Sequence, residues 1–198
     1  MTAKRALRQA MRARRAELAR DLDPAAAGAA IARTVLGFVP DSCRVAVYES
    51  LPHEPPTGPL IEALLASGHE VILPITLKEF SLEWRYAVPG TIGDGTTVTR
   101  RTLDDTDATL GPDALSTCDL IVTPGLTVDR HGARLGQGGG CYDRALAHRN
   151  PAAPVITLLH EGEFSASDLP VEDHDQRVDG YVTTTGRLVR LRESPSPA

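Results

Sequence analysis

The sequence lacks an apolar run that approaches the roughly 18 residues needed to cross a lipid bilayer, although 41% of its 198 residues are hydrophobic. We therefore expect no membrane-spanning segment. Cysteine is also scarce, and Cys43, Cys118 and Cys141 are odd in number with no C-x-x-C spacing. This pattern predicts neither a disulfide framework nor a zinc site, and it favours a reducing, cytoplasmic location.

Positive charge is in deficit, because 21 Lys and Arg face 26 Asp and Glu, which gives a net charge of −5. Such a balance argues against general nucleic-acid binding. The exception is the N-terminus, where Glu17 is the one acidic residue among the first twenty and apolar residues recur at helical spacing. The basic residues of this segment are Lys4, Arg5, Arg8, Arg12, Arg14, Arg15 and Arg20. They suit a transit peptide, a nucleic-acid arm, a solvated helix face or, for Lys4 and Arg8 four residues apart, an anion site.

The remaining chain alternates helical and strand-like segments over a length that fits one domain. Asp23 and Pro24 are typical of a helix start, and Gly68 of a helix end. We predict helices over 24–39, 58–67 and 142–147, and strands over 44–48, 71–74, 82–88, 120–123, 155–159 and 181–184. This order indicates an α/β fold, a three-layer α/β/α single domain with a mainly parallel central sheet, spanning residues 1–192. Residues 89–116 read as a long loop or edge hairpin, and 193–198 as a disordered tail.

The most informative segment is 124–144, PGLTVDRHGARLGQGGGCYDR, which has four glycines at 136, 138, 139 and 140. Glycines between a strand and a helix can wrap backbone N–H groups around a phosphate. Gly140 is not followed by the Lys-Ser/Thr of a P-loop, and the spacing does not fit a dinucleotide fingerprint. Arg134 and Asp143 bracket the loop, as a metal-bound polyphosphate would require. A flexible turn without a ligand is the alternative.

This segment resembles the signature of the 5-formyltetrahydrofolate cyclo-ligase family, which reads roughly P-G-hydrophobic-x-F-D, a spacer, then R-L-G-R-G-x-G-Y-Y-D. The matching residues are Pro124, Gly125, Leu126, Asp129, Gly132, Arg134, Leu135, Gly136, Gly138, Gly140, Tyr142 and Asp143. Three other segments support the resemblance: Lys4-x-x-x-Arg8, residues 48–54 with Thr57, and residues 169–175, which resemble the family's L-P-x-x-x-H-D.

The resemblance implies ATP-dependent closure of 5-formyltetrahydrofolate to 5,10-methenyltetrahydrofolate, with release of ADP and phosphate, by a cytoplasmic, monomeric ligase. Its partners would be ATP and a reduced folate, and neither nucleic acid nor a membrane. No nucleophilic side chain is needed, because phosphoryl transfer depends on positioning and charge neutralisation, here by Arg134 and Tyr142.

The same resemblance assigns residues to three roles. Asp143 and Asp175 would bind Mg²⁺, and Glu54, Glu49 and Tyr142 the folate. The residues assigned to ATP are Lys4, Arg8, Arg134, Leu135, Gly136, Gln137, Gly138, Gly139, Gly140, Cys141 and Tyr142. Taken alone, Glu54 would be read as a surface carboxylate and His174 as a structural or surface histidine.

The chain departs from the family pattern near the expected junction of the substrates. Gln137 replaces an arginine, Cys141 an aromatic residue and Val128 a phenylalanine. The family's F-G-hydrophobic-x-E-P segment is not recognisable in residues 91–100. Two further hypotheses therefore stay open: a diverged relative that binds nucleotide with weak or different activity, and a basic-helix protein whose partner is RNA or another macromolecule.

Overall fold

The structure is a computed structural model, and it describes residues 3–89 and 109–191. The predicted tail at 193–198 and the segment 91–100 lie outside the described residues. Most of the predicted irregular region 89–116 does so as well, although its last part forms the 3-10 helix η1 (Pro112–Thr117).

A seven-stranded sheet organises the protein, with the strand order β10-β9-β7-β4-β1-β2-β3. The five inner strands are parallel, and the edge strands β3 and β10 are antiparallel to their neighbours. The bounds are β1 Arg44–Ala46, β2 Glu70–Thr76, β3 Leu82–Tyr86, β4 Leu120–Pro124, β7 Val155–Leu159, β9 Gly180–Thr183 and β10 Leu188–Arg190. The prediction of a mainly parallel sheet is confirmed.

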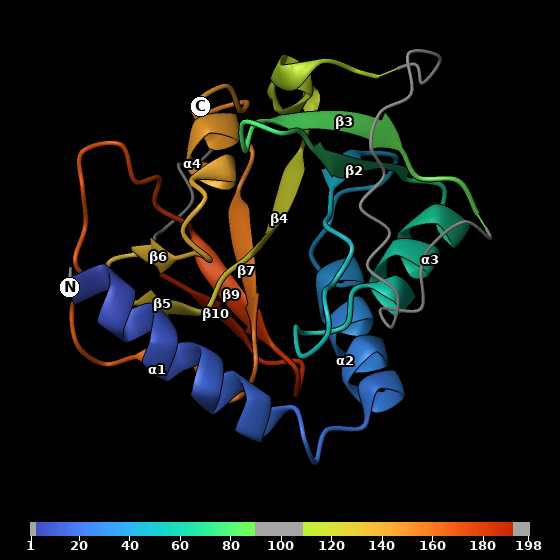
Figure 1. Ribbon diagram of the computed structural model, residues 1–198. Coiled ribbons are helices and arrows are strands. Elements are labelled where there is room, and N and C mark those ends of the chain that lie inside the picture. Colours follow the sequence, from blue (N-terminus) through green and yellow to red (C-terminus); the bar gives the residue numbers. More distant parts are fainter. Residues whose placement is uncertain (1–2, 90–108, 192–198) are drawn as a thin grey trace.

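Helices cover both faces of this sheet (Figure 1). On one face, α2 (Pro24–Leu36) and α3 (Gly58–Ala66) pack on Val45 of β1 and on Val47, which directly follows that strand. On the other face, η1 and α4 (Cys141–Leu146) pack with Ala46 and its equivalents. Strands buried on both faces read as continuous apolar runs, so the predicted three-layer α/β/α architecture is confirmed.

Local sequence signals explain the helix ends. The Asp23 carboxylate accepts hydrogen bonds from the backbone N–H groups of residues 25 and 26, and Pro24 occupies the first turn. Gly68 follows α3 with φ of +81°, a left-handed conformation that suits glycine. The α2 helix ends at Leu36, three residues before the predicted end, because Gly37 caps it and the chain continues in a turn.

A second, three-stranded sheet of β6 (Arg134–Leu135), β5 (Thr127–Asp129) and β8 (Phe164–Ser165) escapes prediction, because each strand has only two or three residues. Its β5–β6 hairpin directly precedes the glycine-rich loop. Asp129 organises this hairpin, since its buried carboxylate accepts hydrogen bonds from the backbone N–H groups of His131, Ala133 and Leu169. The motif aspartate at 129 is therefore a structural residue.

Helix α1 (Ala3–Leu18) packs differently from α2 and α3. Its one buried residue is Arg15, and Leu7 is the residue that packs against an apolar cluster. Polar contacts therefore dominate the attachment of α1 to the protein. Within residues 3–89 and 109–191, every helix is too short or too polar to span a membrane.

Candidate functional site

Two of the predicted site segments follow the carboxyl ends of parallel strands, and contacts bring a third segment, which precedes β9, beside them. Glu54 follows β1, the glycine loop of residues 136–140 follows β4 and the β5–β6 hairpin, and Asp175 precedes β9. In open α/β sheets this edge is where ligands bind. The fold thus brings together segments that are more than a hundred residues apart in the sequence.

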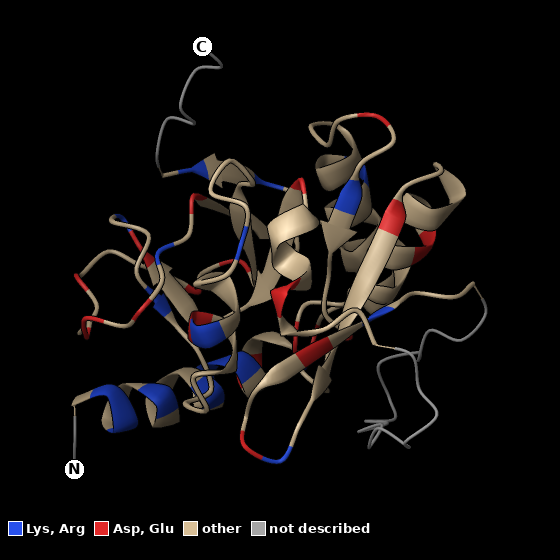
Figure 2. Cartoon of the chain, turned by 90° about the horizontal axis from the view of Figure 1, so that it is seen from above, with Lys and Arg blue, Asp and Glu red and all other residues tan. Residues whose placement is uncertain are grey.

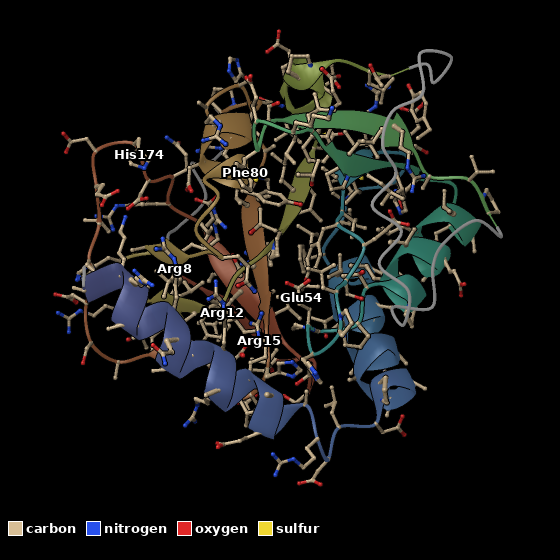
Figure 3. All side chains as sticks on the ribbon, in the orientation of Figure 1. Arg8, Arg12, Arg15, Glu54, Phe80 and His174 are labelled. Atoms are coloured by element: carbon tan, nitrogen blue, oxygen red, sulfur yellow. The ribbon has the colours of Figure 1, made fainter. Side chains whose placement is uncertain are left out.

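One face of α1 is directed at this edge. Arg8 and Arg12 project from α1 toward the body of the protein (Figure 3), and Lys and Arg, in blue, follow the helix in Figure 2. The Lys4 ammonium lies 2.6 Å from an Asp175 oxygen, and Arg8 Nε donates to the carbonyl of Gly136 at 3.1 Å. Of the two residues that were predicted to share a polyphosphate, Arg8 therefore lies against the glycine loop and Lys4 against Asp175.

Arg12 also lies against the glycine loop. It contacts Gln137, one of the residues at which the chain departs from the family pattern. Its Nε donates to Gln137 Oε1 at 2.8 Å and its Nη2 donates to the Gln137 carbonyl at 2.9 Å. A guanidinium from α1 therefore lies beside Gln137, the position where the family pattern has an arginine that this chain lacks. From the sequence we expected Arg12 on the solvated face of the helix. Its spacing of four residues from Arg8, however, places the two side chains on one helix face.

Arg134 and Asp143 form an ion pair of 3.0 Å inside the site, where Arg134 is almost fully buried. The Arg134 guanidinium also lies over the Tyr142 ring, 5.7 Å from its centroid, in a cation–π contact. The Asp143 oxygen also accepts a hydrogen bond at 3.2 Å from the backbone N–H of Gln176. Asp143 is therefore bonded to the neighbour of Asp175, and the two predicted metal ligands lie at one corner of the site.

In this structure the ammonium group of Lys4 forms an ion pair with the carboxylate of Asp175. Burial acts to raise the pKa of Asp175, but the hydrogen bond and charge of Lys4 outweigh it, so the pKa lies below its usual value. Glu172 and His174 bring ligand atoms within 4.8 Å of those of Asp175 and are exposed. Carboxylate oxygens are the hard ligands that Mg²⁺ prefers, so the donor set of this corner suits that ion.

Glycine is required at two positions in particular, one in the β5–β6 hairpin and one in the glycine loop. Gly132 has φ of +76°, and a Cβ there would come within 2.3 Å of the Val178 carbonyl oxygen. Gly138 has φ of +110°, and its bare backbone faces the Arg8 guanidinium, 3.3 Å from where a Cβ would lie. Side chains at these positions would separate the loop from α1 and from the segment that precedes β9.

A second set of groups lies on the side of the site formed by the loop after β1. Glu54 Oε2 accepts a hydrogen bond at 3.0 Å from the backbone N–H of Leu51, and burial raises the pKa of Glu54. The charge of Glu54 acts on the hydroxyls of Tyr48 and Tyr142, and burial raises the pKa of both phenols. Within the described residues, neither buried hydroxyl has a hydrogen-bond partner. Buried polar atoms are usually paired. The two unpaired hydroxyls therefore indicate that a polar ligand binds beside Glu54.

Glu49 has different surroundings, because its carboxylate pairs with Arg85 of β3 at 2.9 Å. The side chains of two other positions are buried. That of Leu135, assigned to ATP, packs in an apolar cluster with Ala133 and Leu169. Val128 is fully buried in the core, so replacing phenylalanine there alters core packing and not the accessible surface of the site.

The strongest contact of α1 was not predicted. The Arg15 guanidinium is fully enclosed and makes two 2.7 Å hydrogen bonds to the carboxylate of Glu163, a residue in the loop after β7. Arg15 also donates to the carbonyl of Gly125. Glu163 in turn accepts from the backbone N–H of His160 at 2.8 Å, and His160 Nε2 lies 2.8 Å from the carbonyl of His53. This network joins α1 to the loop that holds Glu54.

Known proteins give the same assignment as the sequence motifs. The model of the 5-formyltetrahydrofolate cyclo-ligase family matches residues 1–184. A 5-formyltetrahydrofolate cyclo-ligase of Mycolicibacterium smegmatis is 32% identical over 153 residues, which covers 75% of this chain and 77% of that protein. One from Escherichia coli is 33% identical over 145 residues, or 70% of this chain and 76% of that protein.

A solved structure shares the fold. It is the 5,10-methenyltetrahydrofolate synthetase of Aquifex aeolicus, with a TM-score of 0.73, 24% sequence identity, and coverage of 100% of this chain and 97% of that one. The chain described here belongs to the 5-formyltetrahydrofolate cyclo-ligase family, a family of ligases.

Proposed function

We propose that this protein catalyses the ATP- and Mg²⁺-dependent cyclisation of 5-formyltetrahydrofolate to 5,10-methenyltetrahydrofolate, with release of ADP and phosphate. The observation that carries this proposal is the convergence of the α1 cations, the glycine loop and two carboxylates at one edge of the sheet. A bare backbone loop, a row of cations and hard oxygen ligands are what phosphoryl transfer requires. Family membership adds the folate to this general chemistry.

Each group then has a task. Lys4, Arg8 and Arg134 hold the phosphates, and the planar fork of Arg134 suits paired phosphate oxygens. Asp143 and Asp175 hold Mg²⁺, which supplies charge neutralisation to the phosphates when it is bound. In the described structure Arg134 and Lys4 neutralise these two carboxylates. When metal and nucleotide bind, Asp143 and Asp175 would therefore be free to hold the ion, and Arg134 and Lys4 to hold the phosphates.

Glu54, Tyr48 and Tyr142 form the folate side of the site in this proposal. A pterin presents several ring donors and acceptors, which would satisfy the two buried hydroxyls that lack partners. Burial raises the pKa of Glu54, and a carboxyl group perturbed in this way is a candidate for a ligand contact. Tyr142 belongs to both the phosphate side and the folate side of the proposed site. Its ring contacts Arg134, and the charge of Glu54 acts on its hydroxyl.

The proposal is tested by incubating the purified protein with 5-formyltetrahydrofolate, ATP and Mg²⁺ and following the near-UV absorbance of the methenyl product. We expect product only when all three are present, with one ADP released per methenyl group formed. A protein that makes no product while Mg·ATP still raises its melting temperature would contradict the activity. That result would favour a diverged relative that binds nucleotide only.

Arg12 should contribute to ATP binding in place of the arginine missing at 137. We expect Arg12→Gln to raise the KM for ATP by about tenfold, because a charge-assisted hydrogen bond is worth roughly 1.5–3 kcal/mol and solvent screens this exposed site. Arg5→Gln removes the same charge from an exposed position of α1 and should leave this KM nearly unchanged. Steady-state kinetics at low and high salt give both values, and equal effects of the two substitutions would exclude a specific role for Arg12.

We further propose that residues 1–192 act as one domain, as a monomer and in the cytoplasm. The seven-stranded sheet with its helices, the small β6-β5-β8 sheet and α1 are joined by the site contacts described above. The three cysteines are unpaired, and Cys43 and Cys118 are buried, as suits a reducing compartment. Size-exclusion chromatography coupled to light scattering tests the oligomeric state.

A further inference from the structure

Phe80 is an exposed aromatic side chain at the margin of the glycine loop. The chain has only three Phe, four Tyr and one Trp, and the side chain of Phe80 is 56% exposed, the highest value among the exposed large hydrophobic residues of the described structure. Tyr86, the other exposed aromatic residue, lies under the Arg44 guanidinium. The chain has few aromatic rings, and it exposes this one to solvent beside the proposed ligand loop. Phe80 is therefore a candidate ligand contact.

The backbone holds Phe80 in an unfavourable conformation. Phe80 forms the tip of the turn between β2 and β3, with φ of +57°, which is rare for a bulky side chain. The turn is closed by hydrogen bonds between Leu77 and Ser81 and between Phe80 and Leu77. Arg144 of α4 fixes the tip, because its Nη2 donates to the Phe80 carbonyl at 2.5 Å and to the Gly139 carbonyl at 2.9 Å. Strained conformations of this kind are concentrated at ligand sites.

The ring lies directly against the glycine loop. A Cβ at residue 139 would come within 3.0 Å of the Phe80 ring, so the ring fills the space that any side chain at Gly139 would need. Gly139 stands at the position that the sequence pattern G-x-G-x-G leaves variable. In this chain the middle one of three successive glycines therefore makes room for Phe80 and places the edge of an aromatic ring at the loop surface.

We propose that Phe80 is the stacking surface for the adenine base of ATP. The proposal rests on the proposed function, which places the phosphates between α1 and residues 136–138. Phe80 lies beyond the opposite end of this loop, near α4, and well apart from Glu54 (Figure 3). A base attached to phosphates held on the α1 side can extend past Gly139 onto the exposed ring. Stacking of a base on an aromatic side chain is sequence-tolerant and contributes measurable affinity.

The test compares Mg·ATP with Mg·triphosphate, which has the phosphates but no base, in calorimetric titrations of the full-length protein. Phe80→Asn removes the ring, and asparagine tolerates a positive φ. We expect this variant to bind Mg·ATP about tenfold more weakly and Mg·triphosphate as well as the unmodified protein does. Phe80→Trp should retain Mg·ATP binding. In turnover, Phe80→Asn should raise the KM for ATP and leave the KM for 5-formyltetrahydrofolate unchanged.

Other outcomes would overturn the assignment. Equal weakening of both ligands would show that the ring only shapes the loop, and a raised KM for the folate alone would show that it contacts the other substrate. Unchanged Mg·ATP binding would exclude any role in base recognition. Unmodified protein that binds neither Mg·ATP nor Mg·triphosphate would overturn the nucleotide site and, with it, this inference.

Discussion

Arg15→Met is expected to lower the free energy of unfolding by about 3–5 kcal/mol, which is typical for removal of one partner of a buried ion pair. The substitution leaves the Glu163 carboxylate fully buried without its two 2.7 Å hydrogen bonds from Arg15. It also frees the carbonyl of Gly125. Urea denaturation followed by circular dichroism measures the loss.

Two companion variants separate the ion pair from other effects. Arg14→Met makes the same change at the adjacent, exposed position, and should cost less than about 0.5 kcal/mol. Arg15→Met combined with Glu163→Gln removes both charges, while glutamine can still accept from the backbone N–H of His160. We expect this double variant to be more stable than Arg15→Met alone. A double variant no more stable than the single one would show that lost packing, and not an unpaired charge, causes the destabilisation.

Asp143→Asn is expected to change ATP binding in opposite directions with and without Mg²⁺. With the metal present, affinity should fall at least about tenfold, because even outer partners of a metal ligand typically contribute about 10–100-fold. Without the metal, affinity for ATP should rise several-fold, since the substitution removes a negative charge near the phosphates and weakens the hold on Arg134. Calorimetric titrations in Mg²⁺ and in EDTA give both values.

Asp173→Asn is the matched control for this reversal. Asp173 is exposed in the same loop as Asp175, so its substitution removes an equal charge close to the proposed metal corner. It should change both affinities by less than about twofold, because solvent screens exposed charges. If Asp143→Asn weakens binding equally in EDTA and in Mg²⁺, then Asp143 supports the loop and is not a metal ligand.

The way in which α1 is attached explains why the lysine and arginine side chains of the site can exchange carboxylate partners for phosphates. A helix held mainly by apolar packing would keep its position whether or not ligand is bound. Helix α1 buries only Arg15, and the polar contacts of its N-terminal half include Lys4 with Asp175, Arg8 with Gly136 and Arg12 with Gln137. These are the groups that the phosphates and Mg²⁺ compete for, so α1 can adjust at its N-terminal half while Arg15 holds the other half.

Sequence patterns anticipated the fold, and the family resemblance supplied the candidate residues of the site. Apolar strand runs separated by amphipathic segments have few packing solutions, and these solutions place strand ends at one edge. The Asp23 cap and the Gly68 helix end are local interactions, so their residues reveal them. The strands β5, β6, β8 and β10 were missed because pairing between distant segments, and not local propensity, stabilises such short strands.

The sequence by itself determined that the chain has an α/β fold with a glycine-rich loop, a basic N-terminal helix and candidate carboxylates, because periodicity and motif spacing are local properties. Only the tertiary structure decided which charges meet. It enclosed Arg15 with Glu163, placed Arg12 beside Gln137, assigned Asp129 to the hairpin and set Phe80 against Gly139. These contacts join residues from separate parts of the chain, and their energies depend on burial and distance, which no linear pattern records.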